Sequence, residues 1–269
     1  MRGVAVVTAL LAAGGVGAAD LTVATFNTES ASDTHWLEIA RVIRTSERAD
    51  VWALQEVESE DALGRYTAAA ADAAGRGAHY RYIVSESGHN YSPDRRHDLL
   101  ALVFNASDLR QLETIELHAI RSEPDGSRYG RPAWGHRAAL ISRFQLEDTG
   151  AEFYLGTVHL KCCGEHRGGP AIRAHQARLL RDWAKARDVP VIFAGDFNIP
   201  IDPDSAAGNT SSRAFDRLRE AFEWIRPANP AMTYCNPRYG SMLDHIFVRA
   251  ASAVTAESAE VLRTDETDP

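Results

Sequence analysis

The chain has 269 residues, of which 45% are hydrophobic, enough to bury a substantial core in one large or two small domains. Its formal net charge of −8 excludes a global attraction to polyanions, so any contact with nucleic acid has to be local. No linker, internal repeat or low-complexity stretch divides the sequence. We therefore expect a single domain.

The N-terminal residues have the pattern of a secretory signal. Arg2 gives a positive start, residues 4–13 are apolar but too few to span a bilayer, and Gly17-Ala18-Ala19 offers small residues for cleavage before Asp20. We predict a signal peptide over 1–19, a mature domain over 20–269, and a secreted or periplasmic protein without stable membrane association. The alternative is a core strand or helix, which a segment this rich in glycine and alanine disfavours.

Predicted strands and helices follow one another without strict alternation. Apolar runs predict strands over 21–26, 51–54, 99–104, 137–144, 153–158, 191–198 and 243–248. Amphipathic spacing predicts helices over 36–43, 172–183 and 215–222. Residues 85–98 lack any period and contain Gly and Pro, which is typical of an exposed loop. This order indicates an α/β protein with a mixed sheet architecture and helices outside.

Four of the predicted strands end on polar residues. The first ends on Asn27, the second on Gln55-Glu56, the strand over 153–158 on His159, and the strand from Val191 on Asp196 and Asn198. Four such ends in one chain suggest a single site built from neighbouring strands. Carboxylate and amide oxygens suit a hard cation such as Mg²⁺, which takes one or two carboxylates and fills its remaining positions with water and phosphate.

Two further groups of residues leave alternatives open. Arg137 begins an apolar strand, where it could contact phosphate or form an ordinary surface salt bridge. Three cysteines allow at most one disulfide, between Cys235 and either Cys162 or Cys163. They are too few for a recognisable zinc site.

Five short motifs in order resemble the endonuclease/exonuclease/phosphatase superfamily. They are Thr25-Phe26-Asn27, Leu54-Gln55-Glu56-Val57, Val158-His159-Leu160, Gly195-Asp196-Phe197-Asn198 and Leu243-Asp244-His245-Ile246-Phe247-Val248. The resemblance covers nearly the whole predicted mature chain. It implies a four-layered α/β sandwich with two central mixed sheets, a site at one edge, and hydrolysis of phosphoester bonds with Mg²⁺ or Mn²⁺.

The resemblance also implies roles for individual residues. Glu56 would hold the metal ion with support from Asn27, and Asp196 would activate or orient the attacking water. Asn198 would position water or phosphate, and His159 would donate to phosphate oxygens or to the leaving group. Arg137 resembles a phosphate-contacting arginine, and Asp244 an acid that fixes a histidine or binds phosphate through a metal ion. Taken separately, each of these residues could also be a turn former, a strand cap or a buried polar group.

One part of the family pattern is missing. Family members finish with a Ser-Asp-His motif on a last strand, whereas this sequence stops at Thr267-Asp268-Pro269. Asp244-His245 precedes an apolar run that matches the preceding strand better. We therefore expect the given sequence to lack its last strand and one catalytic histidine, with Asp244-His245 as the terminal pair in the rival interpretation.

The resulting functional hypothesis is a secreted, divalent-metal-dependent phosphodiesterase, most plausibly an endonuclease with DNA or RNA as substrate. A phospholipid or sphingomyelin phosphodiesterase would share the chemistry, but no aromatic-tipped apolar hairpin for bilayer insertion is evident. A catalytically silent binding module of the same fold is the third alternative. No obligate protein partner is evident.

Overall fold

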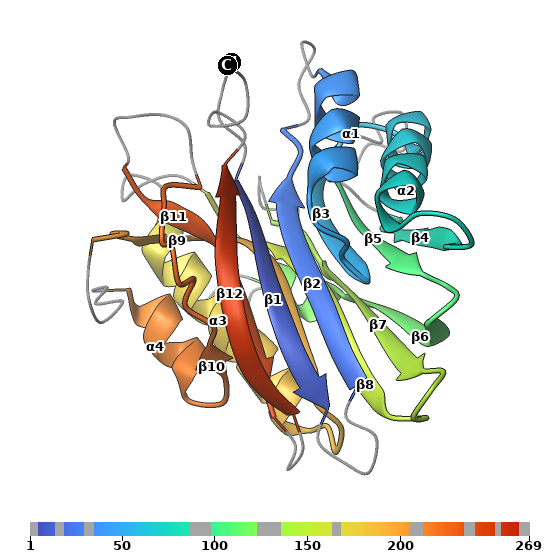
Figure 1. Ribbon diagram of the computed structural model, residues 1–269. Helices are drawn as coiled ribbons and strands as arrows, with labels where there is room; N and C mark the ends of the chain where they lie inside the picture. Colours follow the sequence, from blue (N-terminus) through green and yellow to red (C-terminus); the bar gives the residue numbers. More distant parts are fainter. Residues whose placement is uncertain are drawn as a thin grey trace.

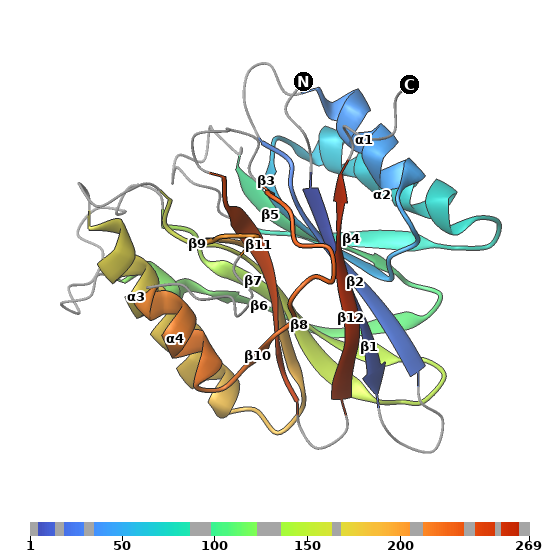
Figure 2. The ribbon, with the colours of Figure 1, turned by 60° about the vertical axis from the view of Figure 1, so that its left-hand side comes forward.

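A computed structural model describes residues 5–13, 19–29, 35–86, 98–122, 136–162, 168–204, 212–233, 240–250 and 254–263. Two six-stranded mixed β-sheets pack face to face, with helices α1 and α2 outside one sheet and α3 and α4 outside the other (Figures 1 and 2). This arrangement confirms the predicted α/β sandwich. None of the helices in the described ranges is long and apolar enough to cross a membrane.

The first sheet has the strand order β12-β1-β2-β3-β5-β4. Its strands are β1 (Ala5–Ala13), β2 (Ala19–Asn27), β3 (Val51–Val57), β4 (Tyr80–Val84), β5 (Leu99–Asn105) and β12 (Val254–Arg263). All neighbours are antiparallel except β2 and β3. Helices α1 (Trp36–Thr45) and α2 (Glu60–Ala74) bury their apolar stripes against the outer face of this sheet.

The second sheet has the strand order β10-β11-β9-β8-β7-β6. Its strands are β6 (Leu109–Leu117), β7 (Ala139–Leu146), β8 (Glu152–His159), β9 (Val191–Ile201), β10 (Glu223–Trp224) and β11 (Met242–Arg249). Only β8 and β9 run parallel. The 3₁₀ helix η1 (His118–Arg121) follows β6, and α3 (Gly169–Lys185) and α4 (Arg213–Arg219) cover the outside.

The two parallel pairs determine where the polar strand ends lie. Helix α1 connects β2 to β3, and α3 connects β8 to β9, so both strands of each pair end at the same edge of their sheet. The register sets Asn27 beside Gln55 in the first sheet and His159 beside Asp196 in the second. Stacking the sheets brings these two edges together as one rim of the sandwich.

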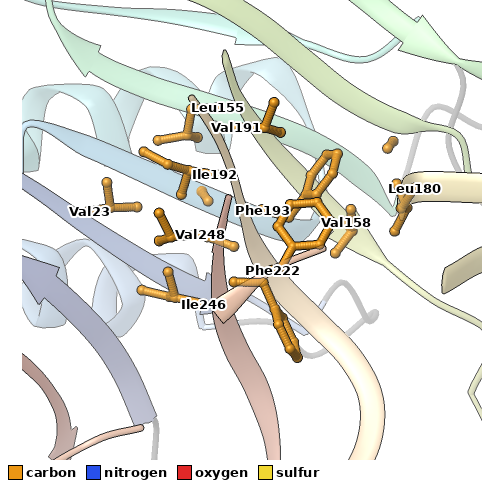
Figure 3. Close-up of a cluster of buried hydrophobic side chains, with 14 of the residues drawn as sticks. Val23, Leu155, Val158, Leu180, Val191, Ile192, Phe193, Phe222, Ile246 and Val248 are labelled. Carbon is orange, nitrogen blue, oxygen red and sulfur yellow. The ribbon is translucent and has the colours of Figure 1, made fainter. Parts of the chain in front are cut away.

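The second sheet has close-packed aliphatic and aromatic side chains on both of its faces. Figure 3 shows Ile192 and Phe193 of β9 with Leu155 and Val158 of β8 in one buried cluster. Neighbouring residues of β9 are both buried because the sheet is covered on both faces, which explains the continuous apolar run in the sequence. The rim is therefore anchored to a tightly packed region.

Two glycines allow the close approach of β8 and β9. A Cβ atom on Gly195 would lie 2.1 Å from the carbonyl oxygen of Val158, and one on Gly156 would lie 2.7 Å from the Phe193 ring. Both distances are far below van der Waals contact. Gly195 is thus required by the packing that delivers Asp196 to the rim.

The segment predicted as a signal peptide includes β1, which pairs with both β2 and β12 (Figure 1). In this chain it forms an interior strand of the first sheet, although its composition disfavours a strand. The pairing of β1 in the uncleaved chain does not test whether residues 1–19 are removed, so cleavage before Asp20 stays a prediction. The structure adds β12, which the hydrophobic pattern did not indicate, beside β1.

Candidate active site

Four predicted site residues meet at the rim where the two sheets come together. The side-chain amide of Asn27 donates both to Glu56 Oε1 and to Asp196 Oδ2, each at 3.1 Å. His159 lies between the same two carboxylates, with Nδ1 3.6 Å from Glu56 Oε1 and Nε2 3.6 Å from Asp196 Oδ2. Asn27 and Glu56 come from the first sheet and His159 and Asp196 from the second. The strand-end pattern therefore predicted a real spatial cluster.

A β-bulge near the end of β3 orients Glu56. The pairing of β3 with β5 shifts register between Leu54 and Val57, and Glu56 has a φ of +53°. The Thr28 hydroxyl lies 3.0 Å from the carbonyl oxygens of both Gln55 and Glu56 and can donate to them. A positive φ is uncommon for a residue with a Cβ, and such conformations persist only where surrounding contacts hold them.

Asp196 and Asn198 form a second bent strand end. Asn198 has a φ of +50°, and its backbone N–H donates to Asp196 Oδ1 at 2.8 Å. Its side-chain amide donates to the carbonyl of Leu160 at 3.1 Å. The Asn198 amide is therefore already bonded to the backbone, and it fixes the strand end that carries Asp196.

The segment 160–161 after β8 is held on all its backbone polar groups. The backbone N–H of Leu160 donates to the Asp196 carbonyl at 2.9 Å, and the Leu160 carbonyl accepts from the Asn198 side chain. The backbone N–H of Lys161 donates to Gln176 Oε1 at 3.0 Å, and the Lys161 carbonyl accepts from Arg173 Nη1 at 2.9 Å. Gln176 and Arg173 lie on α3 and are buried. This helix therefore braces the rim from outside the second sheet, a role that the sequence pattern did not reveal.

Asp244 lies directly across the sheet from Asp196, because β11 pairs with β9 in that register. Its side chain is buried, and Oδ1 has no hydrogen-bond partner among the described residues. Burial, together with the nearby charge of Asp196, raises the pKa of Asp244 well above its usual value. An open acceptor of this kind at the site is consistent with the predicted partnership with a donor or a cation.

Burial also raises the proton affinity of the other two carboxylates. It raises the pKa of Glu56 to about 7, although Arg137 and the Asn27 amide oppose the shift. It raises the pKa of Asp196 to about 6, against hydrogen bonds from Asn198 and Asn27. The carboxylates are therefore poised near neutral pH, as expected for groups that exchange protons or bind a cation.

Arg137 belongs to the site as a buried cation. Its side chain is 5% exposed, and Nη2 donates to Asp98 Oδ2 at 3.2 Å. Its charge acts on both Glu56 and Asp196. The surface salt bridge considered from the sequence is thus replaced by a buried ion pair. Asp98, at φ +60°, was not anticipated because it is the last residue of the segment 85–98, which was interpreted as an exposed loop.

His245 is a core residue. It is 1% exposed, its Nε2 lies 2.9 Å from the carbonyl oxygen of Ile199, and it packs among Phe197, Trp224 and Phe247. Burial lowers its pKa to about 4. A neutral imidazole enclosed by aromatic rings is unsuited to contact a substrate, so this geometry argues against His245 as a terminal catalytic histidine.

The donor set fits a magnesium-like ion held through few protein ligands. Within the described ranges, no group of three or more His, Cys, Asp and Glu side chains is arranged as a complete metal cage. A hard cation with water and phosphate ligands needs only one or two carboxylates. Glu56, with 23% of its side chain exposed, meets that need, whereas Asn27 presents its N–H rather than its oxygen to the carboxylates.

Comparisons with known proteins agree with this fold. The profile described as the Endonuclease/Exonuclease/phosphatase family matches residues 24–266. No curated protein matches the chain. Cys163 and Cys235 lie outside the described residues, so the disulfide stays a prediction.

Solved structures show the same architecture at low sequence identity. Mannosyl-6-phosphatase Bt3783 of Bacteroides thetaiotaomicron has 19% identity and a TM-score of 0.60, over 90% of this chain and 99% of that one. TDP2 of D. rerio, complexed with a single-strand DNA product, has 18% identity and a TM-score of 0.56, over 86% and 84%. The human Nocturnin catalytic domain with bound sulfate has 16% identity and a TM-score of 0.52, over 80% of each chain. At these identities the likeness supports the fold alone.

Proposed function

This chain belongs to the Endonuclease/Exonuclease/phosphatase family, whose members are phosphoester hydrolases that generally use divalent metal ions, and we propose that it is a metal-dependent phosphodiesterase acting on nucleic acid. The observation that carries the proposal is the contact of Asn27, Glu56, His159 and Asp196 across two sheets. These residues come from four separate strands, and packing stability alone does not call for a cluster of buried acids.

Each side chain can perform one part of phosphoester hydrolysis. Asp196, with a pKa raised to about 6 by burial, is ionised at neutral pH and can accept a proton from water at Oδ2. Its other oxygen is held by the backbone N–H of Asn198, which fixes the direction of the carboxylate. His159 can donate an N–H to a phosphate oxygen, and Arg137 supplies positive charge for the same group.

Glu56 would hold the metal ion. When bound, a divalent cation neutralises negative charge on the phosphate and allows carboxylates and substrate to share one site. The raised pKa of Glu56, caused by burial, indicates an acid that gains from a nearby positive charge. Asn27 keeps Glu56 and Asp196 at a fixed separation through its two hydrogen bonds.

Nucleic acid is favoured over lipid by the surface of the described residues. The exposed large hydrophobic residues there are Leu37 on α1, Tyr82 on β4, Leu112 on β6 and Met232 between β10 and β11. None of these segments presents a run of exposed apolar side chains of the kind that inserts into a bilayer. Buried cations Arg137 and Arg173 lie near the carboxylates and provide local positive charge in a chain of net charge −8.

A substrate panel tests the proposal. The protein, with and without residues 1–19, is incubated with plasmid DNA, RNA, sphingomyelin vesicles, a chromogenic phosphodiester and a chromogenic phosphomonoester, each with Mg²⁺, Mn²⁺ or EDTA. We expect EDTA-sensitive cleavage of nucleic acid and of the phosphodiester. Cleavage in EDTA would contradict the metal mechanism.

The other outcomes of the panel identify the alternatives. Preferential turnover of the monoester would favour a phosphatase, the activity named for the Bacteroides thetaiotaomicron structure. Preferential turnover of sphingomyelin would favour a phospholipid or sphingomyelin phosphodiesterase. No turnover of any substrate would favour a catalytically silent binding module. N-terminal sequencing of exported protein tests cleavage before Asp20 and hence the proposed secretion.

A further inference from the structure

Beneath the site lies a buried polar layer, and we propose that Gln55 is a positioning residue that ties the two sheets together and sets the bulge carrying Glu56. The proposal deepens the proposed function, because its consequence is the placement of Glu56 against His159. It concerns Gln55 together with Thr25 and Thr157, all of which are fully buried. None of the three reaches the rim itself.

The three residues stand one step below three members of the site. Thr25 precedes Asn27 by two positions on β2, and Thr157 precedes His159 by two positions on β8. Residues two apart on a strand share a face, so each threonine lies under its site residue. Gln55 precedes Glu56 directly, at the register shift in β3.

Every polar atom of the Gln55 side chain has a partner. The amide nitrogen donates to Thr157 Oγ1 and to the carbonyl of Ala53, both at 2.8 Å. The Thr25 hydroxyl lies 3.1 Å from the amide nitrogen and 3.4 Å from Oε1, to which it can donate. The Thr157 hydroxyl lies 3.3 Å from the carbonyl oxygen of Leu54 and can donate to it. Thr157 and Gln55 belong to different sheets, so these bonds cross the interior of the sandwich.

Two of these bonds act directly on the bulge. The bond from Gln55 to the Ala53 carbonyl folds the side chain back over its own strand, and the contact of Thr157 with the Leu54 carbonyl uses a backbone group where regular pairing with β5 stops. Ala53 and Leu54 are the last residues of β3 in register with β5 before the shift. Hydrogen bonds from Gln55 and Thr157 to their carbonyl groups hold the strand at the point where the chain turns to a positive φ at Glu56.

An apolar side chain could fill the volume that Gln55 occupies, because most of the surrounding core is apolar. A buried amide is tolerated only when its hydrogen bonds are complete, and complete networks favour one arrangement over others. Here that arrangement sets the 3.6 Å separation between Glu56 Oε1 and His159 Nδ1, which belong to different sheets. The layer therefore aligns the sheets at the point where the site spans them.

Two near-isosteric variants test the proposal, one on each sheet. Gln55→Met removes the amide from β3, and Thr157→Val removes the hydroxyl from β8. Because loss of a residue that orients a metal ligand typically costs 10- to 100-fold, we expect each variant to lower kcat and Mn²⁺ affinity by roughly that factor. KM should change less than threefold, roughly, because neither residue contacts substrate. The double variant should be little worse than the worse single variant.

Ser142→Ala is the matched control. Ser142 is also fully buried, and its hydroxyl donates to the Glu113 carbonyl at 2.7 Å within the second sheet, away from the rim. It should lower the thermal stability without changing kcat or Mn²⁺ affinity. Equal kcat losses in the control and in Gln55→Met would overturn the proposal, as would additive effects in the double variant.

A structural readout keeps the inference separate from the proposed function. The crystal structure of Gln55→Met, or of Thr157→Val if the first variant does not fold, gives φ at Glu56 and its distance to His159. Loss of the positive φ or a longer distance supports the positioning role even if no substrate is turned over. An unchanged bulge and distance would overturn it, whatever the activity.

Discussion

Both ends of the sandwich carry several acidic side chains, but the burial and the neighbours of these side chains differ between the two ends. At the rim, Glu56, Asp196 and Asp244 are largely buried among one another and face amides and His159. At the opposite end of the strands, a cavity of about 790 Å³ is lined by residues that include acids from both sheets, among them Asp20, Glu47, Asp50, Asp108, Glu147 and Asp148.

The difference lies in how the charges are compensated. In the opposite cavity the exposed Arg48 pairs with Asp50 at 2.9 Å and also with Asp108. At the rim, burial raises the pKa of Glu56 to about 7 and that of Asp196 to about 6, although Arg137 and amide donors oppose the shift. Burial also raises the pKa of Asp50 in the opposite cavity, against the charge of Arg48. The number of acids is therefore a poor guide to function, because a buried carboxylate whose charge is only partly compensated is the one that gains from binding a proton or a metal ion. The proposed chemistry is therefore assigned to the rim and not to the cavity.

The largest expected effect is a difference in catalytic activity between a substitution at the rim and one in the opposite cavity. Asp196→Asn keeps the shape and the acceptor for the Asn198 N–H, but it removes the base and the acceptor for the Asn27 amide, so kcat/KM for nucleic acid should fall by about 10³-fold. The control Asp148→Asn, in the opposite cavity, should leave kcat/KM within about twofold of the wild type, since it removes no buried charge. Steady-state kinetics measure both. A loss below tenfold in Asp196→Asn would remove the base from the mechanism.

The next effect concerns stability in acid. His245, directly after Asp244, has its pKa lowered to about 4 by burial, against an ordinary value of 6.5. Its contribution to stability is complete above pH 6.5 and is lost as the pH falls to 4, by about 3 kcal/mol. His245→Phe should remove this part of the acid sensitivity in denaturant titrations at each pH. The exposed His79→Phe is the control, and an unchanged slope in His245→Phe would show that the ring does not resist protonation.

A smaller effect of opposite sign is expected from Glu56. Because its folded pKa is raised to about 7 from 4.5, its contribution to stability is present below pH 4.5 and is lost as the pH rises through 7. Glu56→Gln cannot ionise and should be more stable than wild type at pH 8 by roughly 2 kcal/mol, with little difference at pH 4.5. Unfolding in EDTA measures this difference. A destabilised variant at pH 8 would mean that the ionised carboxylate is well compensated.

The sequence predicted the rim well because polar strand ends are a local signal. A polar residue ends each of four apolar runs, at Asn27, Glu56, His159 and Asp196. Because the strands of each parallel pair end at the same edge of their sheet, these residues come together in the fold. Helices α1, α3 and α4 were also indicated by their amphipathic stripes. Helix α1 begins where predicted and ends two residues later, and α3 extends beyond the prediction at both ends. Helix α4 begins two residues before the predicted start and ends three residues before the predicted end. Local pattern therefore gave the parts of the fold that carry the site.

The missed features depend on partners distant in the sequence. Helix α2 has an alanine-rich stripe with little contrast between its faces, and β6 is mostly exposed, so neither shows a strong period. Nothing around Gln55 reveals that its amide reaches Thr157, more than a hundred positions away, and the role of Arg173 follows from its bond to a loop carbonyl. Such contacts exist only after the sheets stack.

The smallest expected effect comes from the ion pairs of the opposite cavity. Arg48→Gln removes the partner of both Asp50 and Asp108, but half of the arginine side chain is exposed, so solvent already screens the charge. We expect a stability change within about 0.5 kcal/mol in 0.15 M salt and no change in kcat. A stability loss several times larger would show that the acids at this end depend strongly on Arg48, and the proposed difference in charge compensation between the two ends would then be wrong.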